Sequence, residues 1–359
     1  MNKKLPLHDF HSENGANFIE QKNWLIPKDY GNVNTELYQV KTAATLLDRS
    51  YLGKIKITGA DTIDFLNRIS TNDITKLVLG TVCDTVFATP KGRIVDYCRA
   101  IRLDNSYLII SSYVDCTHLI EWLSRFHILE DIEITDASRE FHWLTLIGPR
   151  ATEFVKSISG HELQPNDEHI WINYNGMDFA AFLNKNFIYP AYNLCIPADY
   201  EYTLVSWLKE KLVEIEGGLI GDTAFQITRV ESGMPDWGTE LTEEYNPHEA
   251  RLLNAVSFTK GCYTGQEIIA RLDAYDKVQK YLMIIDMDEV ISARPPLEIY
   301  LEDEQIGTLT SYAFDPLANR SVGLGYVKKM YAMEEFLLSV DVIVGNSRIR
   351  AQLRTPPVQ

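Results

Sequence analysis

The chain has 359 residues, too many for one ordinary hydrophobic core, so two or three domains are expected. Apolar residues make up 45% and charged residues 23%, the balance of a soluble globular protein. The formal net charge of -16 disfavours long-range attraction to nucleic acid or to an anionic membrane surface. We therefore expect neither as a partner.

The spacing of cysteines and histidines gives no sign of a metal centre. The 5 cysteines form no Cys-x-x-Cys pair, and the 8 histidines include no His-x-x-x-His or His-Glu-x-x-His. The N-terminus lacks the apolar stretch of a secretion signal, and no apolar run approaches the roughly 20 residues that span a bilayer. Reduced thiols in the cytoplasm fit these features best. Phosphate-binding loops of the Gly-x-x-x-x-Gly-Lys-Ser/Thr and Gly-x-Gly-x-x-Gly types are also missing, which disfavours nucleotidases and dinucleotide-dependent redox enzymes.

In chain order, residues 1–35 are polar and lack a regular pattern, so we expect an N-terminal arm. Alternation in residues 54–58 predicts a strand, Gly59 ends it, and apolar residues at helical spacing follow in 61–69. Strand, glycine and helix recur in this order in residues 144–158. The repetition indicates two related α+β units.

The next patterns are β-structured. Residues 93–103 and 107–110 flank the dipeptide Asp104-Asn105, which predicts a β-hairpin with a tight turn. From about residue 278 onward, short alternating segments and turn residues predict a small all-β domain. The expected parts are thus an N-terminal arm (1–35), an α+β region (36–277) and a β domain (278–359).

Asp96 is the first residue whose position points to chemistry. In a strand it would share a face with Ile94, Cys98 and Ala100. A carboxylate among small and apolar side chains is costly unless it is paired or protonated, so its pKa is often raised and it can exchange protons with a basic nitrogen. The alternative is a strand-end aspartate exposed to water.

A second stretch contains Arg229 and Glu231, which at this spacing would share a strand face or lie close together in an extended turn. They could grip an amide-rich heterocycle, or they could pair with each other. The glutamates at 240, 243, 244 and 249 are interpreted as a solvated acidic loop.

The third stretch, residues 260–267, reads Lys-Gly-Cys-Tyr-Thr-Gly-Gln-Glu and is the densest in unusual chemistry. Its glycines predict a tight turn that presents Cys262. Lys260, the turn backbone and Gln266 could stabilise a thiolate there. The alternative is that Cys262 is a small buried apolar residue.

Taken together, these stretches resemble the YgfZ family, a branch of the folate-binding proteins related to the T-protein of the glycine cleavage system. The motif at 260–267 matches the family signature, and looser matches in the same order extend the resemblance over about residues 40–350. The resemblance implies an α+β fold, in which two interleaved α+β units surround a folate cavity and a C-terminal β-barrel follows. It also implies tetrahydrofolate, or a one-carbon derivative of it, as the cofactor.

The resemblance assigns roles to particular positions. Asp96 matches the acid that lies against the folate nitrogens of the T-protein, and we expect it and Cys262 to be the catalytic residues. The other expected folate contacts are Ile110, Ser112, Asn193, Arg229, Glu231 and Lys260. Asn193 departs from the T-protein pattern, which has a glutamate there, and an amide cannot supply a negative charge to the pterin ring.

Three functions follow from the resemblance. The leading hypothesis is a tetrahydrofolate-binding protein that supports the assembly or repair of iron–sulfur clusters in client enzymes, with iron–sulfur proteins or their assembly machinery as partners. The second is an aminomethyltransferase that passes a one-carbon unit to tetrahydrofolate. The third is a non-enzymatic folate-sensing protein for which the Cys262 turn is a docking surface.

Overall fold

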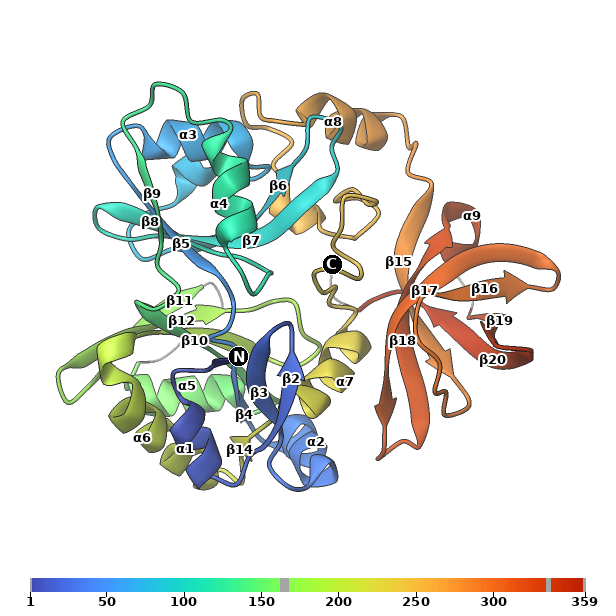
Figure 1. Cartoon of the computed structure of the whole chain (residues 1–359), viewed down its shortest axis with the longest axis horizontal. Helices are drawn as coiled ribbons and strands as arrows, with labels where there is room; N and C mark the ends of the chain where they lie inside the picture. The colour runs from blue at the N-terminus through green and yellow to red at the C-terminus, as the bar shows by residue number, and fades with distance from the viewer. Residues whose placement is uncertain (1, 162–167, 334–336, 358–359) are drawn as a thin grey trace. The chain divides into compact units, whose positions relative to one another are not determined.

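In the computed structural model we describe residues 2–161, 168–333 and 337–357. The chain forms two compact units whose segments alternate along the sequence (Figure 1). The first unit contains residues 1–63, 76–83 and 99–225, and the second contains residues 64–75, 84–98 and 226–359. No helix within the described residues is long and apolar enough to cross a membrane.

The first unit is built on a six-stranded sheet with the order β11-β12-β13-β10-β4-β14. The strands are β4 (Thr45–Asp48), β10 (Phe141–Ile147), β11 (His169–Tyr174), β12 (Met177–Leu183), β13 (Ala191–Pro197) and β14 (Gly218–Leu219). Helices α2 (Val33–Thr42), α4 (Thr117–Ser124), α5 (Ala151–Ser159) and α6 (Glu201–Val213) also belong to this unit. Apolar side chains from β10, β13, α5 and α6 form one buried core.

Residues 1–35, for which we expected an irregular arm, carry regular structure. This segment contains helix α1 (His8–Glu13) and a three-stranded sheet with the order β1-β3-β2. The strands are β1 (Lys3–Lys4), β2 (Asn17–Gln21) and β3 (Trp24–Asp29). The buried His11 of α1 lies 2.9 Å from the carboxylate of Asp48, and its other ring nitrogen lies 2.7 Å from the hydroxyl of Tyr30. These contacts fasten the N-terminal segment to β4.

A five-stranded sheet has the order β6-β7-β8-β5-β9. Its strands are β5 (Lys54–Thr58), β6 (Val82–Ala88), β7 (Ile94–Arg102), β8 (Ser106–Ile110) and β9 (Glu133–Asp136). Strands β7 and β8 pair antiparallel, which confirms the hairpin predicted around Asp104-Asn105. The boundary between the two units falls within β7.

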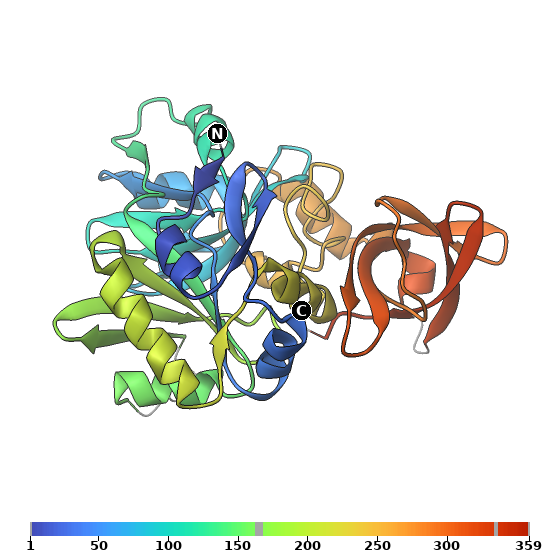
Figure 2. The same ribbon diagram turned by 60° about the horizontal axis from the view of Figure 1, so that its bottom comes forward.

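The second unit contains most of α3 (Thr62–Ile69), most of α7 (Asp222–Ser232), all of α8 (Gln266–Ala274) and a closed barrel with the order β15-β18-β17-β16-β19-β20. The barrel is drawn in orange and red in Figure 2. Its elements are β15 (Lys280–Met287), β16 (Leu297–Leu301), β17 (Glu304–Asp315), β18 (Arg320–Lys328), α9 (Lys329–Ala332), β19 (Leu338–Val344) and β20 (Ser347–Arg354). The β-barrel predicted for the C-terminal region and the overall α+β fold class are confirmed, with the short helix α9 as an unpredicted addition.

Gly59 and Gly148 occupy equivalent positions in the two repeated strand–glycine–helix segments. Both have positive φ, and an added Cβ would lie 2.0 Å from the carbonyl oxygen of Asp131 at the first site and 2.3 Å from that of Ala43 at the second. In each repeat the residue two positions after the glycine donates its amide to that same carbonyl oxygen. This shared geometry supports the related α+β units indicated by the sequence.

Candidate functional site

Asp96 lies in the first half of β7, within the second unit, and is 1% exposed. Its strand neighbours Ile94 and Cys98 are also buried. The alternative of a water-exposed aspartate is therefore wrong. A buried carboxyl group in a strand of mainly apolar residues is the setting in which proton exchange with a ligand nitrogen becomes possible.

The turn that leads into β7 packs against the motif at 260–267. Gly265 has a φ of +84°, and a Cβ there would lie 2.6 Å from the carbonyl oxygen of Thr89 and 3.2 Å from the Cα of Gly92. Gly92, which has a φ of +69°, in turn leaves room for Ile268 and Ile269 of α8. The strand that carries Asp96 and the turn that carries Cys262 thus meet through two glycines within one unit.

Lys260 holds this turn in place. Its ammonium group donates to the backbone carbonyls of Asn67, Ser70 and Asn72, at 2.7, 2.9 and 2.6 Å. These carbonyls lie at and just beyond the C-terminal end of α3, where a positive charge is favoured. Since an ammonium group has three protons, these contacts match its full donor capacity, and the geometry favours a structural role over contact with folate or with a thiolate.

Two further residues of the motif, Tyr263 and Thr264, are also anchored. Tyr263 is buried in an apolar core, and this burial raises the pKa of its phenol to about 12. The amide of Thr264 donates a hydrogen bond to the carbonyl oxygen of Arg68. Cys262, in contrast, is exposed. The alternative of a buried apolar cysteine is wrong, because the turn presents this thiol to solvent.

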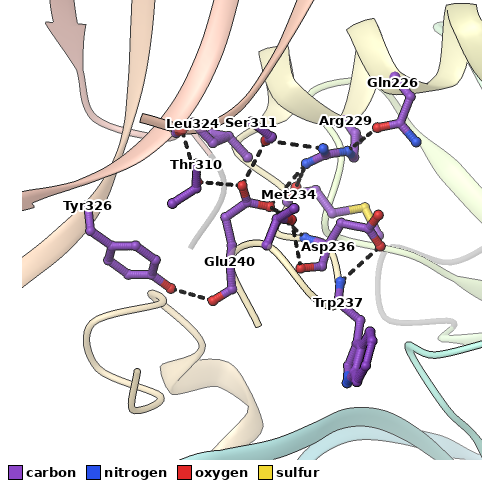
Figure 3. Close-up of polar contacts among 11 residues, drawn as sticks. Gln226, Arg229, Met234, Asp236, Trp237, Glu240, Thr310, Ser311, Leu324 and Tyr326 are labelled. Atoms are coloured by element: carbon purple, nitrogen blue, oxygen red, sulfur yellow. Dashed lines mark hydrogen bonds and ion pairs between the residues drawn. The ribbon is translucent and has the colours of Figure 1, made fainter. Parts of the chain in front are cut away.

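Arg229 belongs to helix α7 and not to a strand, so the predicted shared strand face with Glu231 is wrong. Its guanidinium forms a buried ion pair with Glu240 at 3.3 Å and donates to Gln226, Met234 and Ser311 (Figure 3). Glu231 is also largely buried. The many protein contacts of Arg229 leave it poorly suited to grip a ligand.

Glu240 is fully buried, so the interpretation of a solvated acidic loop is wrong at this position. Its carboxylate accepts hydrogen bonds from Arg229, the amide of Asp236, Thr239, Thr310 and Ser311. Through these bonds α7 and the loop after it are joined to β17 of the barrel, as Figure 3 shows.

The interpretation of a solvated acidic loop is also wrong at Glu249. It is also buried, and burial raises its pKa. Its carboxylate accepts hydrogen bonds from Arg93 and from the amide of Asn246, so it too holds a loop in place. Nothing in the sequence around Glu249 predicts its contacts with Arg93 and Asn246.

Asn193 lies in the first unit, in β13, and is 3% exposed. Its Oδ1 accepts hydrogen bonds from Thr145 at 3.0 Å and from Asn184 at 3.4 Å, and Asn184 itself accepts one from Arg99. This chain of buried amides was not predicted. The side-chain oxygen of Asn193 is used within the protein, which leaves its Nδ2 as the group that a ligand could meet.

Ile110 and Ser112 lie at and just after the end of β8 in the first unit. Ile110 packs in a core cluster with Trp143 and Phe182, whereas Ser112 is half-buried. Of the expected contacts, the structure therefore brings Asp96, Arg229, Glu231, Lys260 and Cys262 into the second unit and Ile110, Ser112 and Asn193 into the first.

An interleaved α+β region followed by a six-stranded closed barrel is the architecture of T-protein-like folds. The family described as the GCVT N-terminal domain matches residues 7–260, and that described as the glycine cleavage T-protein C-terminal barrel domain matches residues 280–358. The chain belongs to this family.

Individual relatives agree with this assignment. The chain is 29% identical over 311 residues to an Arabidopsis thaliana protein that is named as a candidate transferase of the chloroplast. This match covers 86% of this chain and 70% of that protein. It is 27% identical over 354 residues to an aminomethyltransferase of Halalkalibacterium halodurans, covering 95% and 93% of the two chains. The crystal structure of aminomethyltransferase T from Bartonella henselae superposes with a TM-score of 0.80 at 20% identity, covering 99% and 98%, and supports the fold.

Proposed function

We propose that this protein binds tetrahydrofolate, or a one-carbon derivative of it, and that Asp96 contacts a nitrogen of the folate. The observation that carries the proposal is the burial of this one carboxyl group in a strand of mainly apolar residues, in a chain of the T-protein family. A buried acid there can donate a proton to, or accept one from, a ligand nitrogen. The folate would supply the one-carbon chemistry, and the protein would hold and orient it.

Asn193, in the first unit, would contact the pterin differently from the residue that the T-protein has at this position. In the T-protein pattern a glutamate accepts hydrogen bonds from the ring, but Asn193 uses its oxygen within the protein. Its Nδ2 would instead donate to an acceptor on the ring edge. A ligand at Asn193 would therefore receive a donated hydrogen bond and would lack the negative charge of the glutamate.

Within the family, the role that we favour is support of iron–sulfur cluster assembly or repair in client enzymes. It rests on the resemblance of residues 260–267 to the YgfZ signature and on the exposure of Cys262 at an anchored turn. An exposed thiol can reach a partner protein, whereas a buried one cannot. The test is rescue of an iron–sulfur enzyme in a cell that lacks this protein: Cys262→Ala should bind folate normally and fail to rescue.

Aminomethyl transfer is the second candidate, and the names of relatives such as the Halalkalibacterium halodurans protein favour it. Formation of methylene-tetrahydrofolate from an aminomethyl-lipoyl carrier protein would measure it directly. We expect no turnover, because Asn193 cannot provide the charge of the glutamate that it replaces. Turnover that depends on Asp96 would decide for the transferase instead.

A further inference from the structure

Arg49 is a buried cation whose Nε finds no acceptor among the described residues. It follows β4 in the first unit and is 7% exposed, and its guanidinium carbon lies 4.8 Å from the ring centre of Phe225. Its Nε is buried without a hydrogen-bond partner, and within the described part of the chain its side chain forms no ion pair. A guanidinium removed from water normally has an anion or several acceptors beside it, because an unpaired buried charge is costly.

The carboxylate next in sequence is already committed. Asp48 accepts a hydrogen bond from the amide of Ser50 at 2.7 Å and lies 2.9 Å from the ring nitrogen of His11. These contacts hold its pKa below the ordinary value although burial acts to raise it. The carboxylate of Asp48 therefore interacts with His11 and with the amide of Ser50, and it does not form an ion pair with Arg49.

Hydrogen bonds fix the backbone at Arg49, and burial against Phe225 restricts its side chain. The amide of Arg49 donates to the carbonyl oxygen of Trp143 at 2.9 Å, and its carbonyl oxygen accepts from the amide of Leu52 at 3.0 Å. On the next residue, the hydroxyl of Ser50 accepts from the amide of Trp143 at 3.1 Å. A cation held in this way loses little freedom when a ligand binds.

We propose that Arg49 anchors a binding site for the carboxylate group of a small ligand. A guanidinium packed against an aromatic ring still offers the N–H groups at its edge, and this planar fork matches the two oxygens of a carboxylate. Phe225, which lies 6.2 Å from Phe187 between ring centres, supplies apolar surface beside the anion. This carboxylate belongs either to a free small acid or to the glutamate tail of a folate. The assignment to a folate tail rests on the proposed function.

The experiment compares wild type with Arg49→Gln and with the exposed control Arg125→Gln. Thermal unfolding and calorimetric titration are measured with three probes: tetrahydrofolate, tetrahydropteroate, which lacks the glutamate, and free L-glutamate. Without a probe, we expect Arg49→Gln to unfold at the same temperature as wild type or higher, because it removes an unpaired buried charge. A residue needed only for packing against Phe225 would instead lower that temperature.

With the probes, weaker binding of tetrahydrofolate by about tenfold or more in Arg49→Gln, with tetrahydropteroate unchanged, assigns the carboxylate to the folate tail. Loss of L-glutamate binding alone assigns it to a free acid, and this result supports the site even if tetrahydrofolate does not bind to wild type at all. The proposal is overturned if all three probes act on Arg49→Gln as on wild type, or if none of them binds to wild type.

Discussion

Arg229 and Glu240 form an ion pair at 3.3 Å in which their side chains are 5% and 0% exposed. Hydroxyl groups of Thr310 and Ser311 on β17 complete the shell around the carboxylate. Because every partner of Glu240 is polar and buried or half-buried, removal of the carboxylate would leave a buried cation without its counter-charge and several donors with one acceptor fewer. This pair therefore joins α7 to the barrel.

Glu240→Ala tests this role. Breaking one side of a buried ion pair typically costs about 3–5 kcal/mol, and we expect a loss of that order in the free energy of unfolding. Chemical denaturation followed by fluorescence and circular dichroism would measure it. Glu243→Ala, on the exposed side of the same loop, is the matched control and should change little. Equal effects of the two substitutions would contradict the structural role of the pair.

Lys260→Met tests the clamp between the Cys262 turn and the end of α3. The substitution keeps the length of the side chain but leaves three backbone carbonyls without their donor, so we expect a loss of about 3 kcal/mol in unfolding free energy. Lys277→Met changes an exposed lysine of the same region and serves as the control. If tetrahydrofolate affinity falls in Lys260→Met while stability stays at the wild-type value, Lys260 contacts the ligand after all.

The two glycines of the motif offer an internal comparison. Gly265→Ala should destabilise the protein by about 1–3 kcal/mol, because an L side chain at a φ of +84° would be strained and its Cβ would lie 2.6 Å from a carbonyl oxygen. Gly261 has no such φ and no atom within 4 Å of an added Cβ, so Gly261→Ala should be tolerated. A reversed order of melting temperatures for these variants would contradict the packing of the turn against Thr89.

Lys54 predicts a pH dependence of stability. It is buried in β5, and desolvation lowers its pKa from 10.5 to about 8. Between these two values the unfolded chain binds more protons than the folded protein, so this residue makes stability rise as pH increases through that window. The full effect is on the order of 3 kcal/mol. Urea unfolding of wild type and Lys54→Met from pH 7.5 to 10.5 measures it as a difference in slope, and parallel curves would refute the shift.

The sequence predicted those parts of the fold that have a regular apolar pattern. The strand at 54–58, the hairpin around Asp104-Asn105 and the C-terminal barrel show the expected alternation. Helix α7 was missed because it is buried on several sides. Four of its polar residues, Thr228, Arg229, Glu231 and Ser232, are buried, so polar side chains do not mark the exposed face of this helix as they do in a surface helix.

The candidate site was predictable only where a residue type alone carries the signal. Asp96 stood out because a carboxylate interrupts an apolar strand, and Cys262 because two glycines flank it. The contacts of Lys260 could not be predicted, because its acceptors are backbone carbonyls about 190 residues earlier that any side chains could have provided. Arg49 gave no signal either, since its importance lies in the absence of a partner among the described residues.

The most direct test of the central claim is calorimetric titration of the purified protein with tetrahydrofolate, comparing wild type with Asp96→Ala. We predict saturable one-site binding to wild type and an affinity at least about tenfold lower in the variant, because a charge-assisted hydrogen bond to the ligand is lost. Circular dichroism and thermal unfolding would verify that the variant is folded. Equal affinity of the two proteins, or no binding to wild type, would contradict the account.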